Sequence, residues 1–247
     1  MIEISHLYKN YGKRTVLNDI SFTVNKGEIL GFSGLMGAGR TELARAICGA
    51  DKFNSGEILI NDKNVTIKNP ADSVKKGICY LSEDRKRYGL LLNKNVAENT
   101  LLSSLESYSE FGFINDKKAN RDAKTENEKL KTKTPSLREC VKNLSGGNQQ
   151  KVIIARWLLK NTDIFIFDEP TRGIDIGAKS EMYDLIEQLS SKGKSVIIIS
   201  SELSEILGIS DRVIVMCEGR ITKEFSIREA NQENIMRFAM MRESEKI

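Results

Sequence analysis

Gly34-Leu35-Met36-Gly37-Ala38-Gly39-Arg40-Thr41 lies between an apolar run, residues 29–33, and a helix-forming segment, residues 42–47. It fits the phosphate-binding pattern G-x-x-x-x-G-K-[ST], except that Arg40 stands where the pattern has lysine. Glycines in such a turn let successive backbone N–H groups point inward at a phosphate chain, because a Cβ would block the approach. The stretch therefore predicts a strand, a phosphate-binding turn and a helix. The alternative is a glycine-rich turn with no ligand.

The helix predicted to begin at Arg40 or Thr41 would add the positive end of its dipole to this site. Thr41 offers a hydroxyl of the kind that ligates Mg²⁺ beside bound phosphates. Arg40 keeps a positive charge, but its guanidinium is bulkier than an ammonium and forked. It is therefore not equivalent to the lysine of the pattern.

The composition excludes several classes of protein. The 247 residues, 40% hydrophobic and 29% charged, are typical of a soluble α/β domain with a subdomain, or of two small domains. The net charge of +4 is too small and too evenly spread to indicate nucleic-acid binding. Apolar runs such as Val196–Ile199 are too short to span a bilayer, and Met1–Ile4 has no feature of a secretion signal.

The cysteines and the histidine exclude further kinds of site. Cys48, Cys79, Cys140 and Cys217 are widely spaced, so we expect reduced thiols in the cytosol. The only histidine, His6, lies outside every motif. This argues against a histidine metal site and against a Ser-His-Asp catalytic centre.

Two segments before residue 90 are candidates for contact with a nucleotide. Residues 1–24 alternate apolar and polar side chains at both ends, which predicts short strands joined by a loop at residues 8–14. Tyr11 on that loop would stack on a purine ring, or alternatively pack on the sheet. The strand predicted at residues 77–81 is followed by a charged loop that contains Glu83. Such strand ends face the ligand in parallel α/β sheets, although a solvated loop is the alternative.

The middle of the chain predicts helices. Residues 95–142 lack β-branched runs and are rich in Lys, Glu, Asp and Asn, which indicates a mostly helical subdomain. Residues 144–151 read Leu-Ser-Gly-Gly-Asn-Gln-Gln-Lys and open another helix. We expect Ser145 to cap this helix, while Gly146 and Gly147 leave its N–H groups open to an anion. An ordinary capped helix is the alternative.

A strand of four large apolar residues, 164–167, ends in two carboxylates, Asp168 and Glu169. Buried acids usually need a partner. Asp168 would hold Mg²⁺ directly or through water, and Glu169 would face an attacking water as general base.

Downstream the sequence predicts a helix at 178–189, a central strand at 196–199, a helix at 203–207 capped by residues 200–202, an edge hairpin at 213–221 and a helical tail from Arg228.

With these motifs in this order, the sequence resembles the ATPase domains of ABC transporters over essentially its whole length. The resemblance implies an α/β fold: a P-loop NTPase core with a mixed, mostly parallel sheet, an antiparallel β subdomain and an ABC-type helical subdomain. Residues 1–247 would be one domain, with the helical subdomain inserted at about 95–160. The segments 34–42, 83–87, 144–151 and 168–175 look like the second, C-terminal ATPase domain of bacterial monosaccharide importers of the ribose, galactose and xylose type.

The resemblance also implies the site. ATP and Mg²⁺ would be the cofactors, with Thr41 and Asp168 at the metal, Glu169 as the catalytic base and Asp175 at a dimer interface. Ser145 to Gly147 would close on the γ-phosphate bound by a partner domain. The residues implied to contact nucleotide are Tyr11, Gly34, Gly37, Ala38, Gly39, Arg40, Thr41, Glu83, Ser145, Gly146, Gly147 and Ser201.

Three of these residues depart from the general ABC pattern. Arg40 replaces lysine, Glu83 stands in place of a glutamine, and Ser201 stands in place of a histidine that contacts the γ-phosphate. The departures put hydrolysis at this chain's own P-loop in doubt.

The function implied is a peripheral ATP-hydrolysing subunit on the cytoplasmic side of the membrane that powers monosaccharide uptake. Its partners would be a second ATPase domain, transmembrane permease subunits and, indirectly, an external sugar-binding protein, with no nucleic acid.

One alternative is a non-hydrolysing module that completes a partner's site. Another, an ABC ATPase of DNA repair or translation, is disfavoured because the insert is too short for a long coiled coil. The family that the sequence resembles carries two such domains in one chain, so this chain would be an excised half, a truncated product or a half-size subunit.

Overall fold

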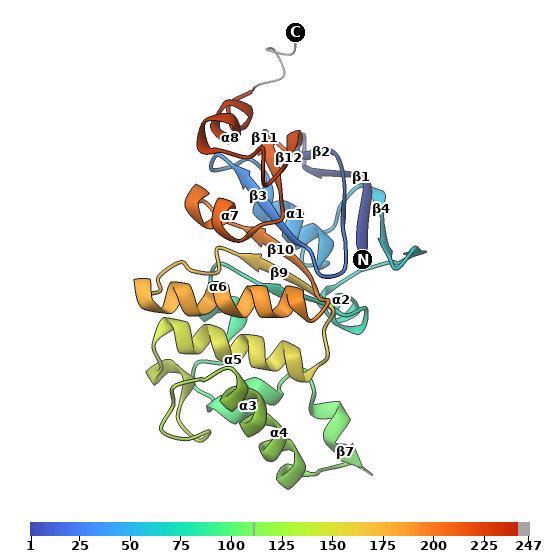
Figure 1. Cartoon of the computed structure of the whole chain (residues 1–247). Coiled ribbons are helices and arrows are strands. Elements are labelled where there is room, and N and C mark those ends of the chain that lie inside the picture. The colour runs from blue at the N-terminus through green and yellow to red at the C-terminus, as the bar shows by residue number, and fades with distance from the viewer. Residues whose placement is uncertain (111, 242–247) are drawn as a thin grey trace. The chain divides into compact units, whose positions relative to one another are not determined.

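The structure, a computed structural model, describes residues 1–110 and 112–241. These residues form two compact units (Figure 1). The first contains Met1–Tyr80, Asp163–Pro170 and the chain from Ile186 onward, and the second contains Leu81–Thr162 and Thr171–Leu185.

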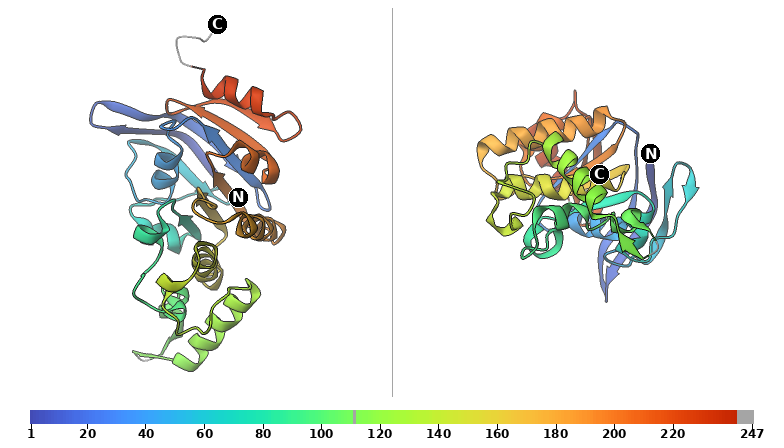
Figure 2. Two further views of the ribbon diagram at one scale, coloured as in Figure 1. Left: turned by 90° about the vertical axis from the view of Figure 1, so that its left-hand side faces the viewer. Right: turned by 90° about the horizontal axis from the view of Figure 1, so that it is seen from below.

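The first unit has an antiparallel sheet with strand order β2-β1-β4-β5. Its strands are β1 (Ile2–Tyr11), β2 (Arg14–Val24), β4 (Ser55–Ile60) and β5 (Lys63–Asn64). β1 and β2 form the long blue hairpin in Figure 2. The expected loop at residues 8–14 is therefore wrong, because only Gly12 and Lys13 lie between the strands. Lys9 occupies a fully buried strand position, and this buried charge hides the apolar alternation from sequence analysis.

The second sheet of this unit has the order β12-β11-β3-β10-β9-β6. Its strands are β3 (Ile29–Gly34), β6 (Ile78–Leu81), β9 (Ile164–Asp168), β10 (Ser195–Ile199), β11 (Arg212–Cys217) and β12 (Arg220–Ser226). β9, β10, β3 and β11 are parallel, and β12 pairs antiparallel with β11 at the edge. Their side chains form a core that includes Phe32, Ile166, Ile197 and Ile214. The predicted central strands and the edge hairpin are confirmed.

The register of this sheet determines where the site lies. Ile199 of β10 pairs with Asp168 of β9 on one side and with Phe32 of β3 on the other. Because the three strands are parallel, their carboxyl ends reach one edge together. The segments that follow them, beginning at Leu35, Glu169 and Ser200, therefore emerge at the same edge of the sheet.

Four helices belong wholly to the first unit: α1 (Arg40–Ile47), α2 (Pro70–Lys75), α7 (Leu203–Ile209) and α8 (Gln232–Ala239). Figure 1 shows α7 and α8 beside the parallel sheet, where α7 contacts β3 and α8 contacts β3 and β11. The expected cap of α7 is wrong, because Glu202 is its N-cap and makes no side-chain bond to the helix. Instead, the Glu202 N–H donates to Ser200 Oγ. The predicted helical tail is α8, and residues 242–247 lie outside the described residues.

The second unit is mostly helical. It contains α3 (Val96–Leu101), α4 (Asp116–Lys129), α5 (Gly146–Leu159), a π-helical turn η1 (Arg85–Gly89), two 3₁₀ turns, η2 (Leu105–Tyr108) and η3 (Val141–Asn143), and a small hairpin of β7 (Ser109–Glu110) and β8 (Phe113–Ile114). α6 (Ile176–Ser191) belongs to it as far as Leu185. Buried Arg156 of α5 donates to the carbonyls of Asn99 and Gly89, which fastens α3 and η1 to α5.

Within the described residues, none of the helices is long and apolar enough to cross a membrane. All four cysteines are free thiols, and Cys48, Cys79 and Cys217 are buried.

Candidate functional site

The turn after β3 has the backbone of a phosphate cradle. Gly34, Gly37 and Gly39 have φ values of 153°, 81° and 101°, a region that residues with a Cβ rarely adopt. A Cβ on Gly34 would lie 2.4 Å from the carbonyl oxygen of Met216, and one on Gly39 would lie 3.0 Å from that of Val16. A Cβ on Gly37 would meet nothing within 4 Å, so this glycine borders open space. The turn can therefore present its N–H groups to an anion.

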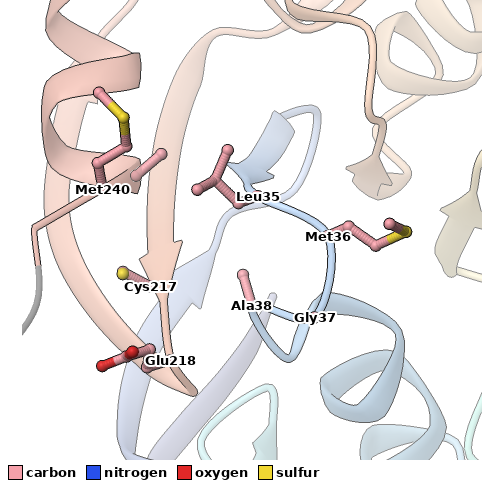
Figure 3. Close-up of a pocket in the computed structure, with 8 residues that line it drawn as sticks. Leu35, Met36, Gly37, Ala38, Cys217, Glu218 and Met240 are labelled. Atoms are coloured by element: carbon pink, nitrogen blue, oxygen red, sulfur yellow. The ribbon is translucent and has the colours of Figure 1, made fainter.

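A partly apolar hollow borders the turn. Figure 3 shows Leu35 and Met36 projecting from the turn in different directions. Both side chains line a hollow of about 380 Å³ that also borders Gly37 and Ala38 of the turn and Cys217, Glu218 and Met240. Met36 is 99% exposed.

Thr41 and Asp168 come together at the edge of the sheet. Thr41 lies in the first turn of α1, and its Oγ1 donates to Asp168 Oδ1 at 3.3 Å. The hydroxyl of Tyr80 donates to Asp168 Oδ2 at 2.8 Å. Burial raises the pKa of the Asp168 carboxyl, although the two hydroxyl donors act in the opposite direction.

The Thr41 hydroxyl and the Asp168 carboxylate suit a Mg²⁺ ion whose remaining ligands are phosphate and water oxygens. Mg²⁺ is usually held by one or two protein oxygens plus substrate phosphates, rather than by an all-protein cage. The described residues contain no group of three or more His, Cys, Asp or Glu side chains that could form such a cage. One hydroxyl and one buried carboxylate beside a phosphate cradle are the donor set that Mg²⁺ with a nucleotide requires.

Glu169 follows Asp168 in a constrained backbone conformation. Its φ is 51°, in the left-handed region, and its N–H donates to the carbonyl of Ile199 at 2.8 Å. Ser201 Oγ donates to Glu169 Oε2 at 3.1 Å. Burial raises the pKa of Glu169, whereas the bond from Ser201 and the charge of Arg40 lower it. A half-buried carboxylate of raised pKa can act as a general base near neutral pH.

Arg40 is directed at the protein backbone. Its side chain is buried, with 9% exposed, and Nη1 donates to the carbonyl of Ser200 at 2.6 Å. Burial lowers the pKa of its guanidinium. The arginine therefore links the start of α1 to the segment after β10, which carries Ser201.

Tyr11 is half exposed at the end of β1, and its hydroxyl donates to Asp51 Oδ2 at 2.7 Å. Sequence analysis selected Tyr11 but missed Asp51, and it also missed Tyr80 beside Asp168. Tyr80 had a detectable signal, since it is a polar aromatic residue near the end of a buried strand. Asp51 had none.

The predicted Glu83 belongs to the second unit and has a partner there. Its carboxylate pairs with the guanidinium of Arg172. Arg85, two residues later, donates to the carbonyls of Arg172 at 2.8 Å and Gly173 at 3.3 Å. The charged loop after β6 is therefore fastened to residues 172–173 by two arginines, a role that the sequence pattern does not indicate.

Ser145 lies at the N-cap of α5, but the expected cap is wrong because its hydroxyl makes no bond to the helix backbone. Asn148 Nδ2 donates to Ser145 Oγ at 2.8 Å, so the Ser145 proton is left free to donate elsewhere. A Cβ on Gly146 would lie 2.6 Å from Arg85 Nη2, and one on Gly147 would lie 2.9 Å from Ala178 Cβ. Both glycines are therefore required by close packing at the start of α5.

A polar hollow of about 240 Å³ borders this helix start. It is lined by Lys133, Ser145, Gly147, Asn148, Asp175, Gly177, Ala178 and Glu181. Asp175 Oδ1 accepts from the N–H of Ala178 at 2.9 Å in the first turn of α6. Ser145, Gly147 and Asp175 thus meet at one hollow of the second unit.

Comparison with known sequences finds a matching family and similar proteins. The family model described as ABC transporter matches residues 17–172. A Halalkalibacterium halodurans protein, provisionally named a ribose/galactose/methyl galactoside import ATP-binding protein, is 51% identical over 231 residues, which are 94% of this chain and 44% of that protein. The ribose import ATP-binding protein of Clostridium tetani is 50% identical over 232 residues, 94% of this chain and 46% of that protein. The chain spans less than half the length of these relatives.

Solved structures agree on the fold. A nucleotide-free ATP-binding cassette from an ABC transporter superposes with a TM-score of 0.81 at 25% identity, covering 96% of this chain and 94% of that one. A dimeric ATP-binding cassette bound to ADP and phosphate gives a TM-score of 0.79 at 20% identity, covering 93% of this chain and all of the other. The α/β fold expected from the sequence is confirmed.

Proposed function

The chain belongs to the ABC transporter family, and we propose that it is the ATP-binding domain or subunit of an importer that couples ATP binding and hydrolysis to monosaccharide uptake. Residues 1–247 would form one ATPase domain with an inserted helical subdomain. The relatives named as ribose and galactose import proteins support a sugar as the transported substrate.

One observation carries this proposal. The glycine turn, the Thr41–Asp168 pair and the Glu169–Ser201 pair follow three parallel strands that end at the same edge of one sheet. A phosphate cradle, a divalent-cation site and a carboxylate base in that relationship are the parts needed for phosphoryl transfer to water.

Each residue has a role in this chemistry. The N–H groups of residues 37–41 would hold the β- and γ-phosphates, and Thr41 and Asp168 would hold Mg²⁺, which neutralises developing charge. Tyr80 orients the Asp168 carboxylate through its hydroxyl. Glu169 would accept a proton from the attacking water, with Ser201 fixing the orientation of its carboxylate.

The start of α5 would serve a different nucleotide. The Ser145 hydroxyl accepts from Asn148 and keeps its own proton. With the N–H groups at the start of this helix, Ser145, Gly146 and Gly147 would close on a γ-phosphate held by a partner ATPase domain. The complete transporter would also need transmembrane permease subunits and an external sugar-binding protein. This domain would then lie on the cytoplasmic side of the membrane as a peripheral component.

A second candidate function is a nucleotide-binding half that hydrolyses little and completes the partner's site. Three contacts favour it. Arg40 is bonded to the Ser200 carbonyl, Glu83 is paired with Arg172, and a serine faces Glu169 where most ABC domains have histidine.

Calorimetry with ADP and ATP, with and without Mg²⁺, tests the proposal. We expect binding at millimolar nucleotide or below, and absence of binding would refute it. Single-turnover hydrolysis by the wild type and by Glu169→Gln separates the two candidates, with exposed Glu187→Gln on α6 as the matched control. A rate that only Glu169→Gln reduces supports hydrolysis at this site, whereas equal rates support the non-hydrolysing half.

A further inference from the structure

Three basic or aromatic side chains converge on one carboxylate beside α1. Asp51 Oδ2 accepts from Lys9 Nζ at 2.7 Å and from the Tyr11 hydroxyl at 2.7 Å. Arg45 donates to both carboxylate oxygens, at 3.0 Å through Nε and at 2.7 Å through Nη2. The arrangement exceeds what a single surface ion pair requires, because Asp51 serves two cations and a phenol together.

The charges in this cluster are firmly held. Lys9 has no exposed surface, and the Asp51 side chain is only 15% exposed. The hydrogen bonds from Arg45 are the main cause of an Asp51 pKa far below its usual range, so the carboxylate stays ionised at physiological pH. Asp51 is therefore a permanent acceptor for the Tyr11 hydroxyl.

The cluster fixes the Tyr11 ring and covers one of its faces. Asp51 holds the hydroxyl, and Lys9 Nζ lies 4.8 Å from the ring centroid. Since Lys9 is fully buried while Tyr11 is 51% exposed, the solvent-accessible surface of the ring lies away from Lys9. An approaching planar group can stack only on that open face.

The loop that carries Asp51 is itself anchored. The Asp51 N–H donates to the carbonyl of Arg45, and the Asn54 N–H donates to the carbonyl of Tyr8 at 2.7 Å. Arg45 is one helical turn after Thr41 on α1. The same carboxylate therefore links the aromatic ring to the helix whose first turn carries the candidate phosphate and Mg²⁺ site.

We propose that Asp51 is a positioning residue for nucleobase recognition: it holds Tyr11 as a rigid, one-sided stacking platform at a fixed distance from the phosphate cradle. This inference rests on the proposed nucleotide-binding function. Holding the ring in place before the base arrives removes part of the ordering cost of binding, which ordinarily weakens affinity by a few-fold for each mobile side chain. The Lys9 ammonium covers the other face of the Tyr11 ring.

Tyr11→Phe is the sharpest test, because it keeps the ring and removes only the bond to Asp51. Affinities for ADP and for inorganic pyrophosphate, which has no base, are measured in the presence of Mg²⁺, the latter by competition. We expect ADP to bind about three- to tenfold more weakly while pyrophosphate is unaffected. Tyr88→Phe, a change at another exposed tyrosine, is the matched control and should alter neither affinity.

Asp51→Asn provides a second variant, since an amide oxygen accepts a weaker bond from the phenol. It should weaken ADP binding in the same direction, with unchanged pyrophosphate affinity. Equal losses for ADP and pyrophosphate in Tyr11→Phe would overturn the inference, because the hydroxyl would then act on the phosphate cradle. Wild-type ADP affinity in Tyr11→Phe would also overturn it while leaving nucleotide binding intact. Failure of the wild type to bind either probe would instead overturn the proposed function.

Discussion

Arg40 Nη1 and the backbone carbonyl of Ser200 are joined by a buried hydrogen bond of 2.6 Å. The bond connects the start of α1 with the segment after β10, and it occupies the guanidinium at the position where the phosphate-binding pattern has a lysine. The arginine charge is therefore used to fasten two parts of the site together. A lysine ammonium in its place would be a compact point charge with freedom to reach a phosphate.

Arg40→Lys should accordingly increase single-turnover ATP hydrolysis if this contact limits the rate. Preorganised donors to the reacting group are each worth roughly a hundredfold or more in rate, which sets the scale of the expected gain. Arg87→Lys, a change at an exposed arginine of η1, is the control. An unchanged rate in Arg40→Lys would show that Glu83 or Ser201 is the limiting departure.

Gly39→Val should abolish nucleotide binding. The new side chain would begin 3.0 Å from the Val16 carbonyl and 3.2 Å from Leu17 Cδ2, at a φ of 101° that valine rarely adopts. The turn must then move, and the N–H groups lose their inward orientation. Calorimetry with ADP and a thermal melt of the same sample measure the two effects.

Gly208→Ala in α7 is the control for Gly39→Val. A Cβ there meets nothing within 4 Å, so alanine should keep ADP binding and stabilise the fold by about 0.5–1 kcal/mol. Retained ADP affinity in Gly39→Val would mean that the turn does not hold the phosphates.

Asp51→Asn should reduce stability at neutral pH by roughly 3 to 5 kcal/mol, because it removes the charge that pairs with fully buried Lys9. The pKa of Asp51 is lower in the folded chain than in the unfolded chain, chiefly because of Arg45. Its stabilisation is thus complete above the unfolded pKa of about 4 and is lost as the pH falls toward the folded value. The difference between wild type and variant should therefore shrink in acid.

Chemical denaturation at several pH values measures this dependence. Asp19→Asn is the control, because its partner His6 is exposed and such surface pairs contribute little. A difference between wild type and Asp51→Asn that stays constant from neutral pH down to pH 3 (about one unit below the unfolded pKa) would contradict the charge-based account.

Much of the fold was predictable because apolar runs and glycines act locally. The buried strands at β3, β9 and β10 are continuous apolar segments with punctuating polar ends, and parallel strands bring those ends to one edge. Thr41 and Asp168, 127 residues apart in sequence, were both selected from their own motifs, and the structure brings their side chains to 3.3 Å.

The missed features depend on contacts between distant residues. Lys9 looks like a solvent-exposed residue in sequence, yet Asp51 neutralises it inside the fold, so the strand β1 extends further than its pattern indicates. Ser145 has the residue type of a helix cap, but its hydroxyl accepts from the Asn148 side chain and makes no bond to the helix backbone. Neither outcome follows from local propensity.

Arg85→Ala should loosen residues 172–175 without unfolding the second unit. The guanidinium donates to two carbonyls of that segment and to Gln149 Oε1 of α5 at 3.4 Å. Hydrogen exchange of amides 172–175 should therefore accelerate several-fold, since the removed bonds restrain that loop. Arg87→Ala, two residues away and exposed, should leave exchange unchanged. Equal exchange in both variants would show that Arg85 does not hold this segment.

Substitutions at Gly147 and at Glu169 should reduce sugar uptake to different extents in a complete importer that contains this chain. Gly147→Asp places a carboxylate at the start of α5, where a partner's γ-phosphate is expected, and like charges in a dry site repel strongly. Sugar uptake should then stop almost completely. Glu169→Gln should be milder, because this chain's own site already has Arg40 and Ser201 at positions that usually carry lysine and histidine.

Gly147→Ala separates charge from crowding in this comparison. Its Cβ would already lie 2.9 Å from Ala178 Cβ, so part of any loss in Gly147→Asp is steric. The charge contribution is the further loss of uptake in Gly147→Asp beyond that of Gly147→Ala, and we expect it to be the larger part. If Glu169→Gln proves as damaging as Gly147→Asp, then this chain's own P-loop site is a working catalytic site, and the bond between Arg40 and Ser200 must open during turnover.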